Sequence, residues 1–231
     1  MKTDLNTEIE SLKTNLIKMA SIVDEQVERV IYALETGEVD HCKGVRARDL
    51  EVDAYDNLIQ TQCENLLTLF QPIDANLRFI LSTLIINNQL ERCGDIAINV
   101  AQRLKKAEAH NELILEARIY EMGQNARKML KQSIDSFIYQ DSDLAMLVIQ
   151  SDDKVDQLNK ETFKFLVKKM ETDVKLIEPC AHLLILTRNL ERLADHATNI
   201  AENLLFFVDG KIISHRKKLE NPPKERDNPK S

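Results

Sequence analysis

The apolar and polar residues of this chain alternate with the period of an α-helix. In the first segment the apolar side chains fall at helical spacing, through Leu12, Leu16, Met19, Val27, Ile31 and Leu34. This spacing aligns them as one stripe along a helix, and such a stripe is buried against neighbouring elements. Five further segments carry the same pattern. We therefore expect helices at about 4–36, 39–70, 74–108, 111–139, 141–173 and 175–208.

Residues typical of helix ends separate these segments. Gly37 can end the first helix, Pro72 precedes a possible N-cap at Asp74, and Asn111 and Asp141 are good N-caps for the next two helices. The chain has only five Gly and five Pro in 231 residues, too few to separate the many short strands of a sandwich or barrel. The composition therefore predicts an all-α protein.

The second half of the chain repeats the first. When residues 84–104 are compared with residues 184–204, ten of the 21 pairs are identical, at Leu84, Ile85, Leu90, Glu91, Arg92, Asp95, Ala97, Asn99, Ala101 and Leu104. The apolar stripe of the first helix also recurs, 103 residues further on, at Leu115, Ile119, Met122, Leu130, Ile134 and Phe137. So much agreement over most of the chain indicates an internal duplication.

The duplicated unit contains three of the expected helices. We therefore predict two antiparallel three-helix bundles in tandem, a first bundle at 1–108 and a second at 109–212. No linker separates them, so we expect one elongated body with the bundles side by side or end to end. Residues 213–231 are charged and proline-containing without apolar periodicity, which is typical of a disordered tail.

Each copy contains the spacing Glu-x-x-x-Asp, which places two carboxylates one turn apart on the same helix face. Residues equally far from the turn of an antiparallel helix pair lie at the same height, because each residue advances both helices by about 1.5 Å. In each copy, a pair of aspartates on the preceding helix is as far from the turn as this Glu and Asp are. The carboxylates thus form one set of Asp49, Asp53, Glu91 and Asp95, and a second set of Asp152, Asp156, Glu191 and Asp195.

A multivalent cation would relieve the repulsion between carboxylates held at one level. All-oxygen ligation suits Mg, Ca, Mn or Fe, and oxygen ligands can also hold zinc. The alternative is a solvated acidic face, since Arg92 and Arg192 follow the two glutamates and surface ion pairs are common. The doubled arrangement favours metal over this alternative.

Several residues near the second set bear on this prediction. Where the first copy has the acidic residues Asp24, Glu25 and Glu28, the second copy has Arg127, Lys128 and Lys131. If these cations face the second set, they neutralise it without metal, so we expect the second site to be weaker. His196 is interpreted as a partly buried structural histidine rather than a ligand, and His182 as a core residue.

Charge and composition exclude other functions. The net charge of −7 and the lack of a basic stripe argue against a nucleic-acid partner. No run approaches the roughly 20 apolar residues of a membrane span, and the N-terminal residues lack the apolar core of a signal peptide, so we expect a cytoplasmic protein without a transmembrane segment. The four cysteines, Cys42, Cys63, Cys93 and Cys180, form no Cys-x-x-Cys pair and are expected to be buried, reduced thiols.

These residues together resemble the PhoU family of bacterial phosphate-uptake regulators. The resemblance rests on the twin segments 90–95 and 190–202, on Gln71-Pro72 with Leu77-Arg78, and on the closing segment 208–211 with His215, and it covers about residues 1–216. Two departures occur, since the family usually has Ile-Gly where this chain has Cys93-Gly94 and Leu193-Ala194, and often has His where it has Ile96.

The resemblance implies two tandem bundles and multinuclear iron, zinc or magnesium sites, with the two carboxylate sets as ligands. It also implies a homodimer that acts on a phosphate ABC transporter, through its ATPase subunit, and on a phosphate-sensing histidine kinase, with negative regulation in high phosphate. Contact with the membrane would then occur only through these partners.

Two other functions remain open at this stage. One is a structural helical adaptor, and the other is an accessory protein of a different phosphate permease without bound metal. We expect no enzymatic activity. A di-iron enzyme built on a helical bundle would need two Glu-x-x-His pairs, whereas the chain has this spacing once, at Glu38 and His41. No Ser/His/Asp set or phosphate-binding loop is recognised either.

Overall fold

The protein is represented by a computed structural model, of which residues 4–209 are described. Its long helices are α1 (Leu5–Thr36), α2 (Val45–Phe70), α3 (Asp74–Ala107), α5 (Ile119–Tyr139), α6 (Ser142–Thr172) and α7 (Ile177–Asp209). Shorter elements join them, namely the 3-10 helices η1 (Val39–Cys42), η2 (Glu108–His110) and η3 (Val174–Leu176) and the helix α4 (Asn111–Glu116). These described residues contain no strand, and none of their helices is long and apolar enough to cross a membrane.

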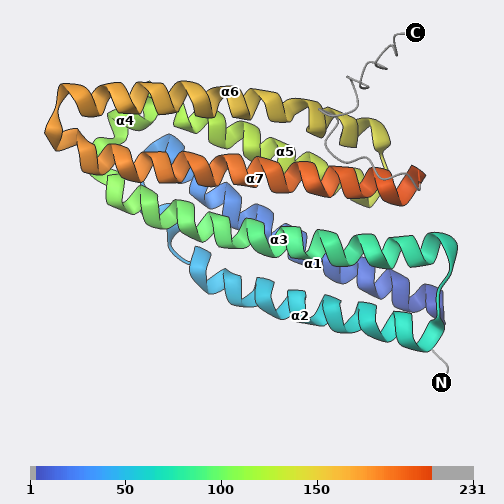
Figure 1. Ribbon diagram of the computed structural model, residues 1–231. Coiled ribbons are helices and arrows are strands. Elements are labelled where there is room, and N and C mark those ends of the chain that lie inside the picture. The colour runs from blue at the N-terminus through green and yellow to red at the C-terminus, as the bar shows by residue number, and fades with distance from the viewer. Residues whose placement is uncertain (1–3, 210–231) are drawn as a thin grey trace, which may run out of the picture.

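The helices form two antiparallel three-helix bundles that lie side by side (Figure 1). Helices α1, α2 and α3 make the first bundle, and α5, α6 and α7 make the second. Helix α3 packs along α7 and α1 packs on α5, so four helices join the bundles, while α2 and α6 lie on the outside. The predicted all-α fold with two tandem bundles is therefore confirmed, and the side-by-side arrangement replaces the end-to-end alternative.

One apolar core runs through both bundles. Three phenylalanines show how it crosses the boundary: Phe79 of α3, Phe137 of α5 and Phe207 of α7 have ring centroids 5.7 to 6.4 Å apart. Aromatic rings at this separation attract one another in addition to the apolar area that they bury. The two halves of the duplication thus share their hydrophobic stabilisation.

The caps agree with the prediction in part. Gly37 ends α1 in the left-handed conformation, with φ +74° and its N–H bonded to the Ala33 carbonyl, and the Asp141 side chain accepts a hydrogen bond from the Leu144 N–H. Asn111 instead lies within the first turn of α4, and its N-cap position is held by His110 without a side-chain bond. Asp74 is the first residue of α3 rather than a residue before it.

Two expected helices begin or end elsewhere. The second helix starts at Val45 because residues 39–42 form a separate 3-10 turn and Gly44 follows with φ +87°. The expected helix 111–139 is broken at Arg118, whose φ is +56°. Thr162 of α6 donates to the Ala117 carbonyl at 2.7 Å, and Arg118 pairs with Glu121 and Glu161, so tertiary contacts hold the break. The expected tail at 213–231 lies outside the described residues.

Candidate carboxylate sites on paired helices

The first carboxylate set lies where α2 faces α3. Asp49 and Asp53 come from α2, and Glu91 and Asp95 come from α3. The structure brings them together, since the charges of Asp53 and Asp95 act on Asp49, and the charges of Asp95 and Asp53 act on Glu91. The equal heights predicted from the sequence therefore correspond to spatial neighbours.

Two acids of this set, Asp49 and Glu91, have raised pKa values because they are partly buried and close to other carboxylates. Burial raises the pKa of Asp49 above its ordinary value, and the neighbouring Asp53 and Asp95 raise it further, against a hydrogen bond from Gln26 that lowers it. Burial likewise raises the pKa of Glu91, where Arg92 opposes the effect and nearby carboxylates add to it. The site holds more negative charge than its own cations neutralise.

Two residues of this site were not predicted from the sequence. Asp56, one turn beyond Asp53, adds its charge to the surroundings of Glu91 and accepts a 2.6 Å hydrogen bond from the Asn87 amide. Gln26 of α1 is fully buried, and its amide nitrogen lies 3.0 Å from the Val45 carbonyl and 3.4 Å from Oδ1 of Asp49. A glutamine on the apolar stripe of an amphipathic helix is the signal that could have identified it.

A glycine lets α3 approach this set closely. A Cβ atom added at Gly94 would lie 3.0 Å from Oδ1 of Asp49 and 3.2 Å from Oε1 of Gln26. Two buried oxygens, Oε1 of Gln26 and Oε2 of Glu91, have no hydrogen-bond partner among the described residues, although the Arg92 guanidinium lies 3.3 Å from the glutamate oxygen. Acceptor atoms of this kind favour a donor or a cation beside them.

The second set repeats this arrangement between α6 and α7. Burial raises the pKa of Glu191 of α7 above its ordinary value, and the charges of Asp195, Asp156 and Asp152 raise it further, while Arg188 lowers it. The Arg188 guanidinium lies 2.5 Å from Oε1 of Glu191, and the other carboxylate oxygen is buried without a hydrogen bond within residues 4–209. Both predicted sets are therefore brought together by the fold.

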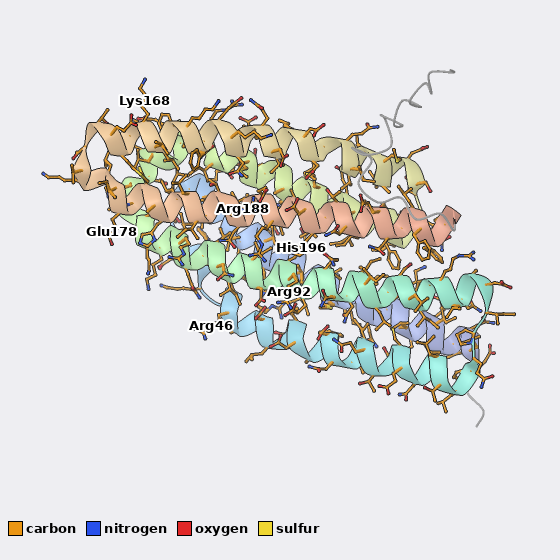
Figure 2. The ribbon with its side chains drawn as sticks, viewed as in Figure 1. Arg46, Arg92, Lys168, Glu178, Arg188 and His196 are labelled. Carbon is orange, nitrogen blue, oxygen red and sulfur yellow. The ribbon has the colours of Figure 1, made fainter. Side chains whose placement is uncertain are left out.

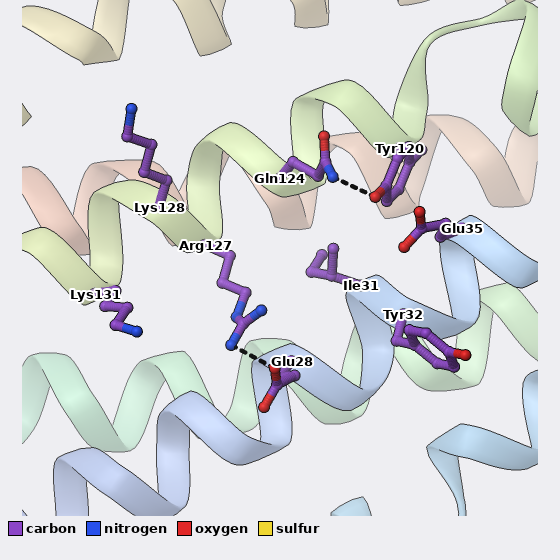
Figure 3. Close-up of a pocket in the computed structure, with 9 residues that line it drawn as sticks. All are labelled: Glu28, Ile31, Tyr32, Glu35, Tyr120, Gln124, Arg127, Lys128 and Lys131. Carbon is purple, nitrogen blue, oxygen red and sulfur yellow. Dashed lines mark hydrogen bonds and ion pairs between the residues drawn. The ribbon is translucent and has the colours of Figure 1, made fainter.

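The three cations that were expected near the second set face elsewhere. Arg127, Lys128 and Lys131 line a groove between α1 and α5. Figure 3 shows the Arg127 guanidinium directed at Glu28 of α1, whereas the Lys128 side chain points away from α1. The Arg127 guanidinium lies 2.8 Å from Oε1 of Glu28 and 3.5 Å from Oδ1 of Asp24. Because Arg127 pairs with Asp24 and Glu28 of the first bundle, it is not available to neutralise the second set.

The donor atoms suit a hard cation, but they do not converge as they stand. Carboxylate oxygens are preferred by Mg²⁺, Ca²⁺ and Mn²⁺, and the oxygens of Glu91 and Glu191 that have no hydrogen bond within the described residues offer lone pairs to such an ion. Among residues 4–209, however, no three His, Cys, Asp or Glu side chains are arranged to hold a metal ion. Metal binding would require the carboxylates to turn towards one another, and it stays a prediction.

The cysteines do not contribute to either set. Cys63, Cys93 and Cys180 are buried, Cys42 is half-buried, and all four are free thiols. Burial raises the pKa of Cys42 to about 11 and that of Cys63 to about 12, so both stay protonated at neutral pH.

Comparisons with known proteins agree with this architecture. The PhoU domain matches the chain twice, at residues 16–104 and 119–204. Proteins described as phosphate-specific transport system accessory protein PhoU homologs are similar over nearly their whole length. The relative from Caulobacter vibrioides is 34% identical over 215 residues, which cover 92% of this chain and 94% of that protein, and the relative from Aquifex aeolicus is 34% identical over 209 residues, covering 90% and 95%.

Solved structures show the same fold. The crystal structure of PhoU from Pseudomonas aeruginosa superposes with a TM-score of 0.82 at 31% identity, covering 90% of this chain and 100% of that one. The phosphate transport system regulatory protein PhoU from Streptococcus pneumoniae has a TM-score of 0.83 at 24% identity, covering 92% and 100%, and supports the fold alone. With two matched domains, duplicated carboxylate sets and full-length relatives, this chain belongs to the PhoU family.

Proposed function

We propose that the protein is a cytoplasmic accessory regulator of phosphate-specific transport that lowers phosphate uptake and phosphate-starvation signalling when phosphate is abundant. The observation that carries this proposal is the match of both halves of the chain to the PhoU domain, together with relatives described as accessory proteins of the phosphate-specific transport system. The family is non-enzymatic, which agrees with the expected lack of a catalytic constellation.

The proposed partners are the ATPase subunit of a phosphate ABC transporter and a phosphate-sensing histidine kinase, with the protein acting as a homodimer. Two bundles with a shared core suit this role because they present long helical faces to a partner. Since no described helix can cross a membrane, the protein would reach the transporter through protein contacts.

A genetic experiment tests the regulatory role. Deletion of the gene in its host, followed by assay of a phosphate-starvation reporter in high phosphate, is expected to release repression, and the intact gene is expected to restore it. Repression that persists in the deletion strain would contradict the proposal and would favour an accessory protein of a different phosphate permease.

We further propose that each carboxylate set binds a divalent metal ion, Fe, Zn, Mg or Mn. The support is the excess of partly buried carboxylates with raised pKa values, each set including a glutamate oxygen without a hydrogen bond within the described chain. Such an ion would neutralise these charges and join α2 to α3 and α6 to α7. The alternative is an adaptor with two acidic seams and no metal.

Elemental analysis of the purified, untagged protein before and after chelation separates these possibilities. The Glu91→Gln/Glu191→Gln double variant is the informative comparison, and Glu178→Gln, which changes an exposed glutamate of the same helix α7, is the matched control. Stoichiometric metal in the wild type and in the control, lost from the double variant, is expected. A protein that takes up none of the four metals would support the metal-free adaptor.

A further inference from the structure

Each bundle has a groove that continues, beyond the carboxylate set, the seam between the two helices that carry this set. The groove between α6 and α7 has a volume of about 510 Å³, and the corresponding groove between α2 and α3 has about 470 Å³. The duplication relates them, since Leu184 lines the former and Leu84, its equivalent 100 residues earlier, lines the latter. The two grooves therefore have a common origin and can be compared position by position.

The two grooves differ in charge. The charged residues lining the α6–α7 groove are all cations, Lys160, Lys164 and Arg188, whereas the charged residue lining the α2–α3 groove is Glu64. At the position of Arg188 the first copy has Asn88. The chain as a whole carries a net charge of −7, so this concentration of cations does not follow from its composition.

An exposed aromatic ring lies among these cations. Phe163 of α6 is 55% exposed and lines the groove opposite Leu184 of α7. Its equivalent in the first copy is Gln60, which is polar and exposed. Covering a large exposed apolar side chain beside a concave surface is favourable, so such a position is typical of a site where a partner binds.

Two of these three cations also contact the second carboxylate set. Arg188 pairs with Glu191, and the ammonium nitrogen of Lys160 lies 3.9 Å from Oδ2 of Asp156. Arg188 lies in the first half of α7 (Figure 2). These carboxylates hold the cations in place, and carboxylates of a partner could exchange with them.

We infer that the α6–α7 groove is the docking site for an acidic segment of a partner protein. An apolar side chain of that segment inserts between Phe163 and Leu184, and its carboxylates pair with Lys160, Lys164 and Arg188. A groove between two helices accepts a peptide lying along the seam, and cations around an apolar centre select a negatively charged one. This inference rests on the proposed accessory role for the existence of a protein partner.

Fluorescence anisotropy with a synthetic probe tests the groove directly. The probe is a fluorescein-labelled amphipathic peptide of Glu and Leu with one Phe, and the reference probe has Lys in place of Glu. The intact protein is expected to bind the acidic probe, more weakly as salt is raised, and not to bind the basic one. Lys160→Gln/Lys164→Gln/Arg188→Gln should weaken binding about tenfold, since three exposed ion pairs are removed.

Phe163→Ala should also weaken binding of the acidic probe about tenfold, because the apolar anchor is lost. Its melting temperature should change little, since the ring is already half in water. The matched control is Gln60→Ala in the α2–α3 groove, which should leave binding unchanged.

Two results would overturn the inference. The first is equal binding of the acidic probe by the groove variants and the intact protein. The second is no binding of the acidic probe; if the same residues are then required for binding phosphatidylserine vesicles, or for self-association measured by sedimentation, the groove is a site for a lipid surface or for a second copy of the chain. If the probe binds through the groove but deletion of the gene leaves the phosphate reporter unchanged, the proposed function fails while the groove stands.

Discussion

Nδ1 of His196 on α7 lies 2.6 Å from Oε1 of Gln89 on α3, so a histidine beside the second carboxylate set connects the two bundles. The same amide oxygen lies 3.3 Å from the side-chain nitrogen of Asn199. Because an amide oxygen only accepts, the imidazole must donate its Nδ1 hydrogen. This half-buried position agrees with the interpretation of His196 as a structural residue.

Acidification should destabilise the protein at this histidine, although the charged ring would still donate from Nδ1. Burial lowers the pKa of His196 below its ordinary value of 6.5, and the positive charges of Arg192 and Arg92 lower it further. The unfolded chain therefore takes up the proton first, and stability is lost as the pH falls from 6.5 through the folded pKa. We expect His196→Gln to lose less stability than the wild type between pH 7 and about 5.5, measured by urea denaturation. Equal losses would contradict this assignment.

A substitution at Gly94 should reveal its close contact with Asp49. Gly to Ala inside a helix ordinarily stabilises by about 0.5–1 kcal/mol. Here the new methyl group would lie 3.0 Å from Oδ1 of Asp49, so we expect no gain and a cost of about 1 kcal/mol. In an Asp49→Ala background part of the ordinary gain should return, since Oε1 of Gln26 still lies 3.2 Å from the new methyl group. A coupling near zero in this double-mutant cycle, measured by urea denaturation, would show that the carboxylate moves aside freely.

Much of the fold follows from local sequence. The apolar stripe through Leu12, Met19 and Leu34 is fully buried, as the helical spacing predicts. The break at Arg118 could not be predicted this way, because it depends on a hydrogen bond from Thr162, far along the chain. The left-handed conformation is unfavourable for a residue other than glycine, so the position of this break depends on tertiary contacts that stabilise it.

The candidate sites were predictable to the extent that helix geometry determines them. Asp53 and Glu91 are equally far from the turn, and this was enough to predict that they are neighbours, since both helices of an antiparallel pair rise by the same distance per residue. The direction of Arg127 was not predictable, because a residue's height on a helix does not say which neighbouring helix it faces. That choice depends on how the bundles pack, and here Arg127 turns to α1.

The pairing of Arg127 with Glu28 should be measurable as a coupling free energy. Arg127→Glu places a third acid near Asp24 and Glu28 and should destabilise the protein by about 1–2 kcal/mol, a modest amount because these side chains are partly exposed. Adding Glu28→Lys should recover about half of the loss. The control is Lys128→Glu, an exposed position of the same groove, which should change stability by less than about 0.5 kcal/mol. Equal effects of the two reversals would refute a specific pair.

The carboxylates of the two sets should destabilise the metal-free protein at neutral pH. Burial and the neighbouring acids raise the pKa of Glu191, so the native state retains a proton at a pH where the unfolded chain has lost it. Stability therefore falls as the pH rises from the ordinary value of 4.5 through the folded pKa. In the presence of a chelator, Glu191→Gln should melt at a higher temperature than the wild type at pH 7, and the difference should shrink towards pH 4.5.

The same variant should respond oppositely when metal is added. If a divalent ion binds the second set, it stabilises the wild type by an amount that rises with the logarithm of the metal concentration above its Kd, and Glu191→Gln loses that gain. Glu178→Gln, an exposed change on the same helix, should follow the wild type in both conditions. A Glu191→Gln protein that melts below the wild type even with chelator would contradict this expectation. The attraction between Glu191 and Arg188 would then outweigh the repulsion from the neighbouring aspartates, and the second set would be stable without metal.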